Sequence, residues 1–385
     1  MFIFNRLGKK QITQDELEEK LDILRLPTSY VFTPVNLKEE QKKFFASDDY
    51  NPVFKYNPVK NINDKILREL SSVSSVEDVD PRISDFYLKL IDSKSEVNDM
   101  LNAVGHNEKI TEISRRRFGK PSEKLFKNSS RVLRGLIKSY KLVQKKNEAR
   151  EFGYDEIERI MKEFLKELGL TDWTVAKSGR IADEAMKVGI KRKEVLIAPD
   201  ISRSPQDLRK SIVHEIGTHV FRSYNGLVSG IPVLYKPNLP DSQDIEEGLA
   251  TYNEEYMNVL TYDALRRKAC FTWMLYWAEQ TSFRELYNAL TSFLARNLAF
   301  DFTYRVKRGL GDTSLPGLYY KDVMYFRGYR KVRKAIEKDS SLYEKLYSGK
   351  ISLKQVEWVD DGLIPKPKLT PNPAEFERVF KKLGI

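Results

Sequence analysis

The sequence predicts an α+β fold that is mostly helical, with a small antiparallel sheet and a helical N-terminal region. Amphipathic runs of helical period recur along the chain, whereas residues 173–176 and 194–198 are typical of short strands. Of the 385 residues, 41% are hydrophobic and 11% aromatic, so the chain can bury a sizeable core. A disordered, fibrous or low-complexity chain is therefore excluded.

The N-terminal part is expected to be an accessory region, residues 1–150, followed by a second domain, residues 151–385. In this part, helical patterns alternate with extended, proline-bearing segments, and Asp80-Pro81 opens a long amphipathic run. A basic stretch near Arg150 marks the predicted boundary. The helices predicted around this boundary cover residues 83–104, 122–146 and 154–168.

In the second domain, local signals place the ends of the helices. Ser204 is suited to cap a helix with Pro205 at its first position, and this helix should end before Asn225-Gly226. The next helix should follow Asp241 or Ser242. Further helices are predicted at residues 262–280, 282–296 and 321–338.

Composition narrows the possible partners and cofactors. With 66 Lys and Arg against 55 Asp and Glu, the formal net charge is +11, which favours an anionic partner. The single cysteine, Cys270, excludes a disulfide within the chain and a cysteine-based zinc finger, so a metal would be held by His and carboxylates. No apolar run is long enough to span a bilayer and no signal-peptide core follows Met1, so we expect a cytoplasmic protein.

Two of the three histidines, His214 and His219, belong to an HExxxH pattern in the helix after Pro205. On a regular α-helix this spacing of five would put the rings roughly 140° apart, too far to share one ion. A π-bulge closes a wider hydrogen-bonded ring and would return both rings to one side, and Gly217 has no Cβ to resist it. We therefore expect a π-bulge around Gly217.

A catalytic zinc ion commonly takes a third protein ligand and leaves one position for water. The remaining histidine, His106, lies in an expected loop, whereas Glu246 and Glu247 begin the next helix. On that helix Glu247 points away from the apolar stripe, together with Thr251 and Glu254, while Glu246 lies on the flank. Glu247 is therefore the expected third ligand. Gly248 beside it would let a second helix approach closely.

Glu215 follows the first ligand directly and is the expected proton shuttle. It would take the proton of the attacking water and pass it to the leaving amine, while the ion polarises the scissile carbonyl. The alternative is that His214 and His219 are ordinary helix histidines and that Glu215 is a solvated acid. For Glu246 and Glu247 the alternative is stabilisation of a helix N-terminus by acidic side chains.

Beyond this pattern, the sequence resembles the microtubule-associated tyrosine carboxypeptidases and their prokaryotic relatives with a QEGLA motif. The resemblance spans about residues 50–370. The segments that carry it are 214–219 with Arg222 and Asn225-Gly226, 246–250, 307–309, 312–317, 321–322 with Tyr325 and Gly328, and, more weakly, 51–58 and 118–121.

The resemblance implies a gluzincin-like zinc peptidase that removes a C-terminal aromatic residue, Tyr or Phe, from a protein or peptide. It implies one zinc ion per chain, held by His214, His219 and Glu247, with Glu215 as the catalytic acid and base. Tyr325 is a candidate hydrogen-bond donor to the oxyanion. The candidates for binding the substrate carboxylate are Arg308, Lys321 and Arg222, and those for supporting the ligands are Glu246, Thr251 and Asn225.

Two other functions stay open at this point. An endopeptidase or aminopeptidase could use the same site. A basic protein that binds nucleic acid or a polymer, with zinc in a structural role, would account for the basic runs at 114–120 and 138–150, but these lack interleaved aromatics. The favoured partner is the C-terminal tail of a peptide or protein, acidic if the net charge steers it, rather than a membrane or nucleic acid. The sequence leaves the oligomeric state open.

Overall fold

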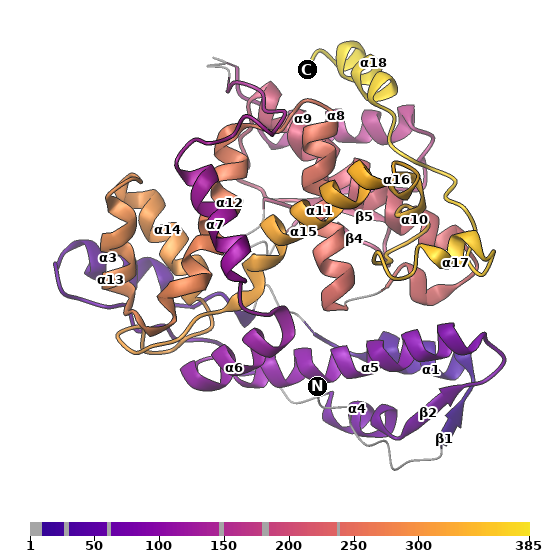
Figure 1. Ribbon diagram of the computed structural model, residues 1–385, viewed down its shortest axis with the longest axis horizontal. Coiled ribbons are helices and arrows are strands. Elements are labelled where there is room, and N and C mark those ends of the chain that lie inside the picture. Colours follow the sequence, from indigo (N-terminus) through magenta and orange to yellow (C-terminus); the bar gives the residue numbers. More distant parts are fainter. Residues whose placement is uncertain (1–9, 27–30, 60–62, 146–149, 179–184, 237–238) are drawn as a thin grey trace. The chain divides into compact units, whose positions relative to one another are not determined.

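The computed structural model (Figure 1) describes residues 10–26, 31–59, 63–145, 150–178, 185–236 and 239–385. Most of these residues are helical and the strands are short, as the predicted class requires. Residues 1–9, which bear on the predicted lack of a signal peptide, lie outside the described part, as do residues 27–30 of the extended segment predicted at residues 27–34. None of the described helices is both long enough and apolar enough to cross a bilayer.

The chain forms two compact units, and each is assembled from separate stretches of sequence. Unit 1 comprises residues 1–122, 238–240 and 273–323, and unit 2 comprises residues 123–237, 241–272 and 324–385. This division differs from the predicted boundary at residue 150, because a distant stretch of the chain folds with the N-terminal residues. The assignment of accessory and catalytic roles to residues 1–150 and 151–385 stays a prediction.

Unit 1 combines a two-stranded sheet with helices. Strand β1 (Lys10–Ile12) pairs in parallel with β2 (Val73–Val76). The long helix α5 (Pro81–Asn102) begins at the predicted site, where the Asp80 carboxylate accepts a hydrogen bond from the Arg82 backbone N–H. The remaining elements of this unit are α1 (Gln14–Ile23), α3 (Leu37–Phe45), α4 (Asp64–Ser71), α6 (Asn107–Phe118), η3 (Ala278–Gln280), α13 (Phe283–Thr291), α14 (Arg296–Lys307) and η4 (Tyr320–Asp322).

Unit 2 contains a three-stranded sheet with β5 (Glu194–Ile197) in its centre. β4 (Met186–Gly189) pairs with β5 in antiparallel fashion, but β3 (Thr174–Lys177) pairs with β5 in parallel. The predicted antiparallel sheet is therefore wrong for one of its two pairings. A short connection that ends at Lys193, with φ 50°, folds β5 back onto β4, while β3 lies on the other edge and runs in the direction of β5.

The helices of unit 2 largely follow the predicted pattern. Helix α10 (Phe221–Val228) runs through Asn225-Gly226, although the prediction ended the helix before these residues. Helix α7 (Glu123–Leu133) was expected to continue to residue 146. It ends early because Gly135 adopts φ 75° and the Leu136 N–H donates to the Arg131 carbonyl, which closes the helix. The other elements that lie wholly or mostly in this unit are α8 (Tyr154–Glu167), α9 (Pro205–His214), η1 (Glu215–Val220), α10 (Phe221–Val228), η2 (Pro232–Leu234), α11 (Pro240–Tyr256), α12 (Tyr262–Trp277), α15 (Val323–Lys338), α16 (Leu342–Lys345), α17 (Glu357–Asp360) and α18 (Pro373–Leu383).

The helix formed by α9, η1 and α10 is continuous and buries one face in the core of unit 2. The Ser204 hydroxyl caps it by accepting from the Asp207 N–H, as predicted. Its buried side chains include Ile212, Ile216 and Val220, which join a core shared with α8, β5 and α18. Edge strand β4 also packs against η1. This anchoring fixes the rotation of the helix about its axis, and hence the direction of its polar face.

Helices α11 and α15 cross at two glycines of unit 2, Gly248 and Gly328. A Cβ on Gly248 would lie 2.2 Å from the Gly328 carbonyl carbon, and one on Gly328 would lie 1.9 Å from the Asp244 carbonyl oxygen. The backbones therefore touch, and the predicted close approach at Gly248 is confirmed. The crossing lies one residue after Glu247 and fixes the position of that side chain.

We expect Gly248→Ala to lower the free energy of unfolding by about 3 kcal/mol or more, because neither backbone can retreat from the added methyl group. Denaturant titration checks this. Gly153→Ala is the matched control, since a Cβ there meets nothing within 4 Å, and its cost should stay below about 1 kcal/mol. Equal stability of Gly248→Ala and the parent would contradict the close crossing.

Candidate metal centre

The helix that carries the two histidines contains the predicted π-bulge. Element η1 is a π-helix over Glu215–Val220, and the Phe221 N–H that follows it donates to the Ile216 carbonyl five residues earlier. Because the wide turn absorbs the extra residue, His214 and His219 lie on the same side, with ring centroids 5.1 Å apart. The prediction of a bulge around Gly217 is confirmed.

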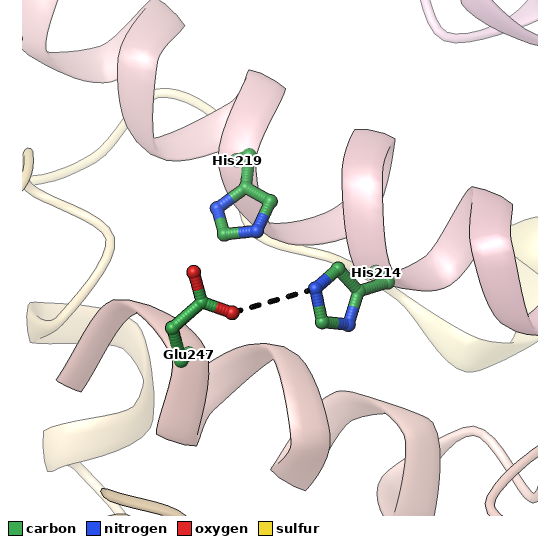
Figure 2. Close-up of side chains that lie close together, drawn as sticks. All are labelled: His214, His219 and Glu247. Carbon is green, nitrogen blue, oxygen red and sulfur yellow. Dashed lines mark ion pairs between the residues drawn. The ribbon is translucent and has the colours of Figure 1, made fainter. Parts of the chain in front are cut away.

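Glu247 faces both imidazoles from the neighbouring helix α11, as Figure 2 shows. One ligand atom from each of His214, His219 and Glu247 lies within 4.8 Å of the others. His214 Nε2 lies 3.6 Å from Glu247 Oε2. Their side chains are 19%, 14% and 19% exposed, respectively, so the cluster is sheltered but accessible.

A second carboxylate fixes the orientation of each imidazole. His214 Nδ1 is 2.8 Å from Glu254 Oε1, and His219 Nδ1 is 2.7 Å from Glu246 Oε1. A carboxylate on Nδ1 fixes the ring and leaves Nε2 as the nitrogen that can bind a metal. This is the arrangement that metal-binding histidines usually have.

The two orienting carboxylates are themselves buried and paired with cations. Burial raises the pKa of Glu254, but Lys268, 3.4 Å away, and His214 outweigh burial and bring the pKa to about 2. Burial likewise raises the pKa of Glu246, but Lys350 and Arg222 hold it well below its usual value. Both carboxylates therefore stay ionised and can accept from the imidazoles.

The charge of the cluster suits a cation. Burial lowers the pKa of His214, but hydrogen bonds to Glu247 and Glu254 and the nearby charge of Glu215 raise it overall to about 10. Positive charge is thus stabilised at this position. A tetrahedral zinc ion needs ligand atoms about 3.3 Å apart, and the atoms of this cluster lie within 4.8 Å of one another. The donor set of two imidazoles and one carboxylate fits zinc with an open position.

Three other predicted site residues, Glu215, Thr251 and Tyr325, also belong to unit 2. Glu215 follows His214 in η1 and is partly exposed. The Thr251 hydroxyl donates to the Glu247 carbonyl at 3.0 Å, so it supports the ligand's backbone. Tyr325 is partly buried on α15, one turn before the crossing at Gly328. The catalytic roles of Glu215 and Tyr325 stay predictions.

Arg222 does not have the predicted role in binding substrate. It is fully buried, and its guanidinium pairs with Glu246 and donates to the carbonyls of Leu346, Gly349 and Ile351. A substrate carboxylate cannot reach a group enclosed in this way. The arginine instead neutralises the carboxylate that orients His219.

Asn225 does not support the ligands as predicted. Its amide accepts from the backbone N–H groups of Lys368 and Leu369 and donates to the Leu369 carbonyl at 2.7 Å. It therefore fastens the chain before α18 to α10, since an amide side chain can satisfy both polar groups of an extended backbone.

Arg308 and Lys321 belong to unit 1, whereas the cluster belongs to unit 2. Arg308 is nearly buried, with its guanidinium 3.6 Å from Asp322 and over the ring of Tyr319. Lys321 is partly exposed beside the same aspartate. Their binding of a substrate carboxylate stays a prediction.

The roles of Glu254, Lys268 and Lys350 were not predicted from the sequence. Glu254 lies two helical turns after Glu247, and the sequence places it on the same face, but without the role of orienting His214. Lys268 and Lys350 lie on other elements, and Lys350 is 104 residues from Glu246. No local pattern links such distant residues.

We expect Glu254→Gln to raise the Kd for zinc by about 10- to 100-fold, because the amide holds the ring of His214 less firmly. Competition with a chelator of known affinity measures this. Glu255→Gln is the matched control, since Glu255 is also buried on α11 but accepts from Tyr329 and the Lys141 N–H. An equal loss of affinity in both variants would contradict the orienting role.

Comparison with known proteins supports the resemblance in the sequence. A model of the family described as microtubule-associated tyrosine carboxypeptidase matches residues 42–383. Human MATCAP2 is 35% identical over 123 residues, which cover 31% of this chain and 23% of that protein. The microtubule-associated tyrosine carboxypeptidase 1 of Rattus norvegicus is 29% identical over 178 residues, or 44% and 37% of the two chains. These matches thus span well under half the length of the relatives. The match of the family model over most of the sequence nevertheless shows that this chain belongs to the microtubule-associated tyrosine carboxypeptidase family.

Proposed function

We propose that this protein is a zinc-dependent carboxypeptidase that removes a C-terminal aromatic residue, Tyr or Phe, from a peptide or protein. The observation that carries the proposal is the cluster of His214, His219 and Glu247, whose ligand atoms lie within 4.8 Å of one another. Membership of a family whose name describes a tyrosine carboxypeptidase supports the reaction. One zinc ion per chain would complete the site.

The ligand set favours a catalytic over a structural ion. Structural zinc sites are closed by four protein ligands, whereas catalytic sites use three and remain accessible. Here the ligands offer two imidazoles and one carboxylate, and each keeps 14–19% of its side chain exposed. A basic binding protein with a structural zinc ion is therefore the weaker proposal.

The chain's own residues supply proton transfer and positioning. When bound, zinc polarises the scissile carbonyl and makes water more acidic. Glu215 takes the proton of the attacking water and delivers it to the leaving amine, which converts the peptide bond into a carboxylate and a free amino acid. Tyr325 is proposed to donate to the oxyanion, and Arg308 or Lys321 to bind the terminal carboxylate.

The substrate is proposed to be an extended, acidic C-terminal tail. Within the described part of the chain, β4 is an edge strand that packs against η1, so its outer backbone groups can pair with an extended peptide. The net charge of +11 would attract acidic residues. The relatives' names mention microtubules, and a cytoplasmic location of this protein stays a prediction.

Glu215→Gln should keep its zinc but lose about 10²- to 10⁴-fold in kcat, because the amide cannot accept a proton. Metal analysis and turnover of a peptide ending in Tyr are measured on the same preparation. Removal of zinc by a chelator should abolish turnover of the parent, and added zinc should restore it. A Glu215→Gln protein with unchanged kcat would contradict the shuttle.

A peptide with a free C-terminal Tyr should be cut, whereas the same peptide with an amidated C-terminus should not, because a carboxypeptidase recognises the terminal carboxylate. Mass spectrometry of the products checks this. Cleavage of both peptides would indicate an endopeptidase or aminopeptidase.

Comparison of an acidic with a neutral tail at low and high salt tests attraction by charge, which should favour the acidic tail at low salt.

A further inference from the structure

A chain of buried polar groups joins η1 to α11 and to the segment after α16, all within unit 2. The Tyr347 hydroxyl donates to the Gly217 carbonyl at 2.9 Å and accepts from Asn253 Nδ2 at 2.6 Å. Asn253 Nδ2 also donates to the Thr218 hydroxyl at 2.7 Å. Tyr343 completes the chain by donating to Asn253 Oδ1 at 3.0 Å. Two consecutive residues of the π-helix are thus held from outside it.

Three of these four side chains are fully enclosed, and Tyr343 is partly buried. Thr218, Asn253 and Tyr347 are each 0% exposed. A buried hydrogen-bond network is rigid. Breaking any of its bonds leaves a buried polar group without a partner, at a cost of about 1–3 kcal/mol. The network can therefore hold a local geometry that the helix would not keep alone.

The π-helix needs such support. Wide turns of this kind are rare because an ordinary α-helix satisfies the same backbone groups with better geometry. Gly217 also faces the ring of Phe376, which would lie 3.2 Å from a Cβ at that position. The network and this ring fix the carbonyl and the Cα of the same residue, midway between the two histidines.

We propose that Tyr347 and Asn253 are positioning residues that hold η1 in its π-helical form and so keep His214 and His219 on one face. Asn253 lies on α11, the helix that also presents Glu246, Glu247 and Glu254. One helix thereby supplies the third proposed ligand, both orienting carboxylates and the Asn253 side chain that binds the π-helix. The effect on zinc rests on the proposed function, but the hold on η1 does not.

The test uses Tyr347→Phe, which removes the hydroxyl and keeps the ring. In the metal-free protein, backbone amides of residues 215–222 should exchange hydrogen at least about tenfold faster than in the parent, while those of α8 change less. The Kd for zinc should rise by about 10- to 100-fold. In the cobalt-substituted protein, the intense d–d absorption of four-coordinate cobalt should weaken.

Tyr262→Phe is the matched control, because that hydroxyl also donates to a backbone carbonyl, Val132 at 3.0 Å, but does not touch η1. Thr218→Val, which removes the other contact of Asn253 with the π-helix, serves as a second variant should Tyr347→Phe fold poorly. Tyr347→Phe and Thr218→Val should change hydrogen exchange and zinc affinity in the same direction, and Tyr262→Phe should match the parent in both.

The outcomes separate the two proposals. If exchange at residues 215–222 and the cobalt spectrum stay unchanged in both network variants, the positioning role is wrong, whatever the protein catalyses. If the parent binds no zinc but the network variants still open η1, the zinc peptidase is wrong and the hold on the π-helix stands.

Discussion

The wide turn of η1 governs the rest of the site. A helix cannot present two side chains five residues apart to one ion unless its backbone takes up the extra residue, and rotation of the whole helix cannot help because it moves both rings together. Here the opposite face, with Ile216 and Val220, is fully buried in the core of unit 2. The turn therefore has to be made locally, between His214 and His219, where Gly217 offers the least steric resistance.

Around this turn, each buried carboxylate is matched with one or two cations. Lys268 and Glu254 stand behind His214, while Arg222, Lys350 and Glu246 stand behind His219. Burying such groups is unfavourable unless each has a partner, so the pairs contribute little to net stability but make the geometry sensitive to the loss of either member. Such charges can hold the rings of His214 and His219 at fixed angles even though they add little to the stability of the fold.

Some residues that carry the family resemblance serve packing rather than the site. In unit 1, the motif at residues 309–317 forms a tight loop in which the Asn107 amide binds backbone groups of Gly311, Asp312 and Pro316. Gly317 has φ 137°, and a Cβ there would lie 2.8 Å from the Thr111 hydroxyl. These glycines are accounted for by close packing, so a matching motif does not by itself mark a residue that touches substrate.

The sequence alone determined the helical class, the Ser204 cap, the π-bulge and the clustering of His214, His219 and Glu247, because each follows from spacing along one or two helices. It could not place β3 beside β5, since strand direction depends on connections rather than on the strands. Nor could it foresee that Arg222 is enclosed by residues 346–351, or that Tyr347 reaches Gly217, 130 residues away. Such contacts join residues that only the packing of distant segments brings together, and they decide which charges meet substrate and which hold the site.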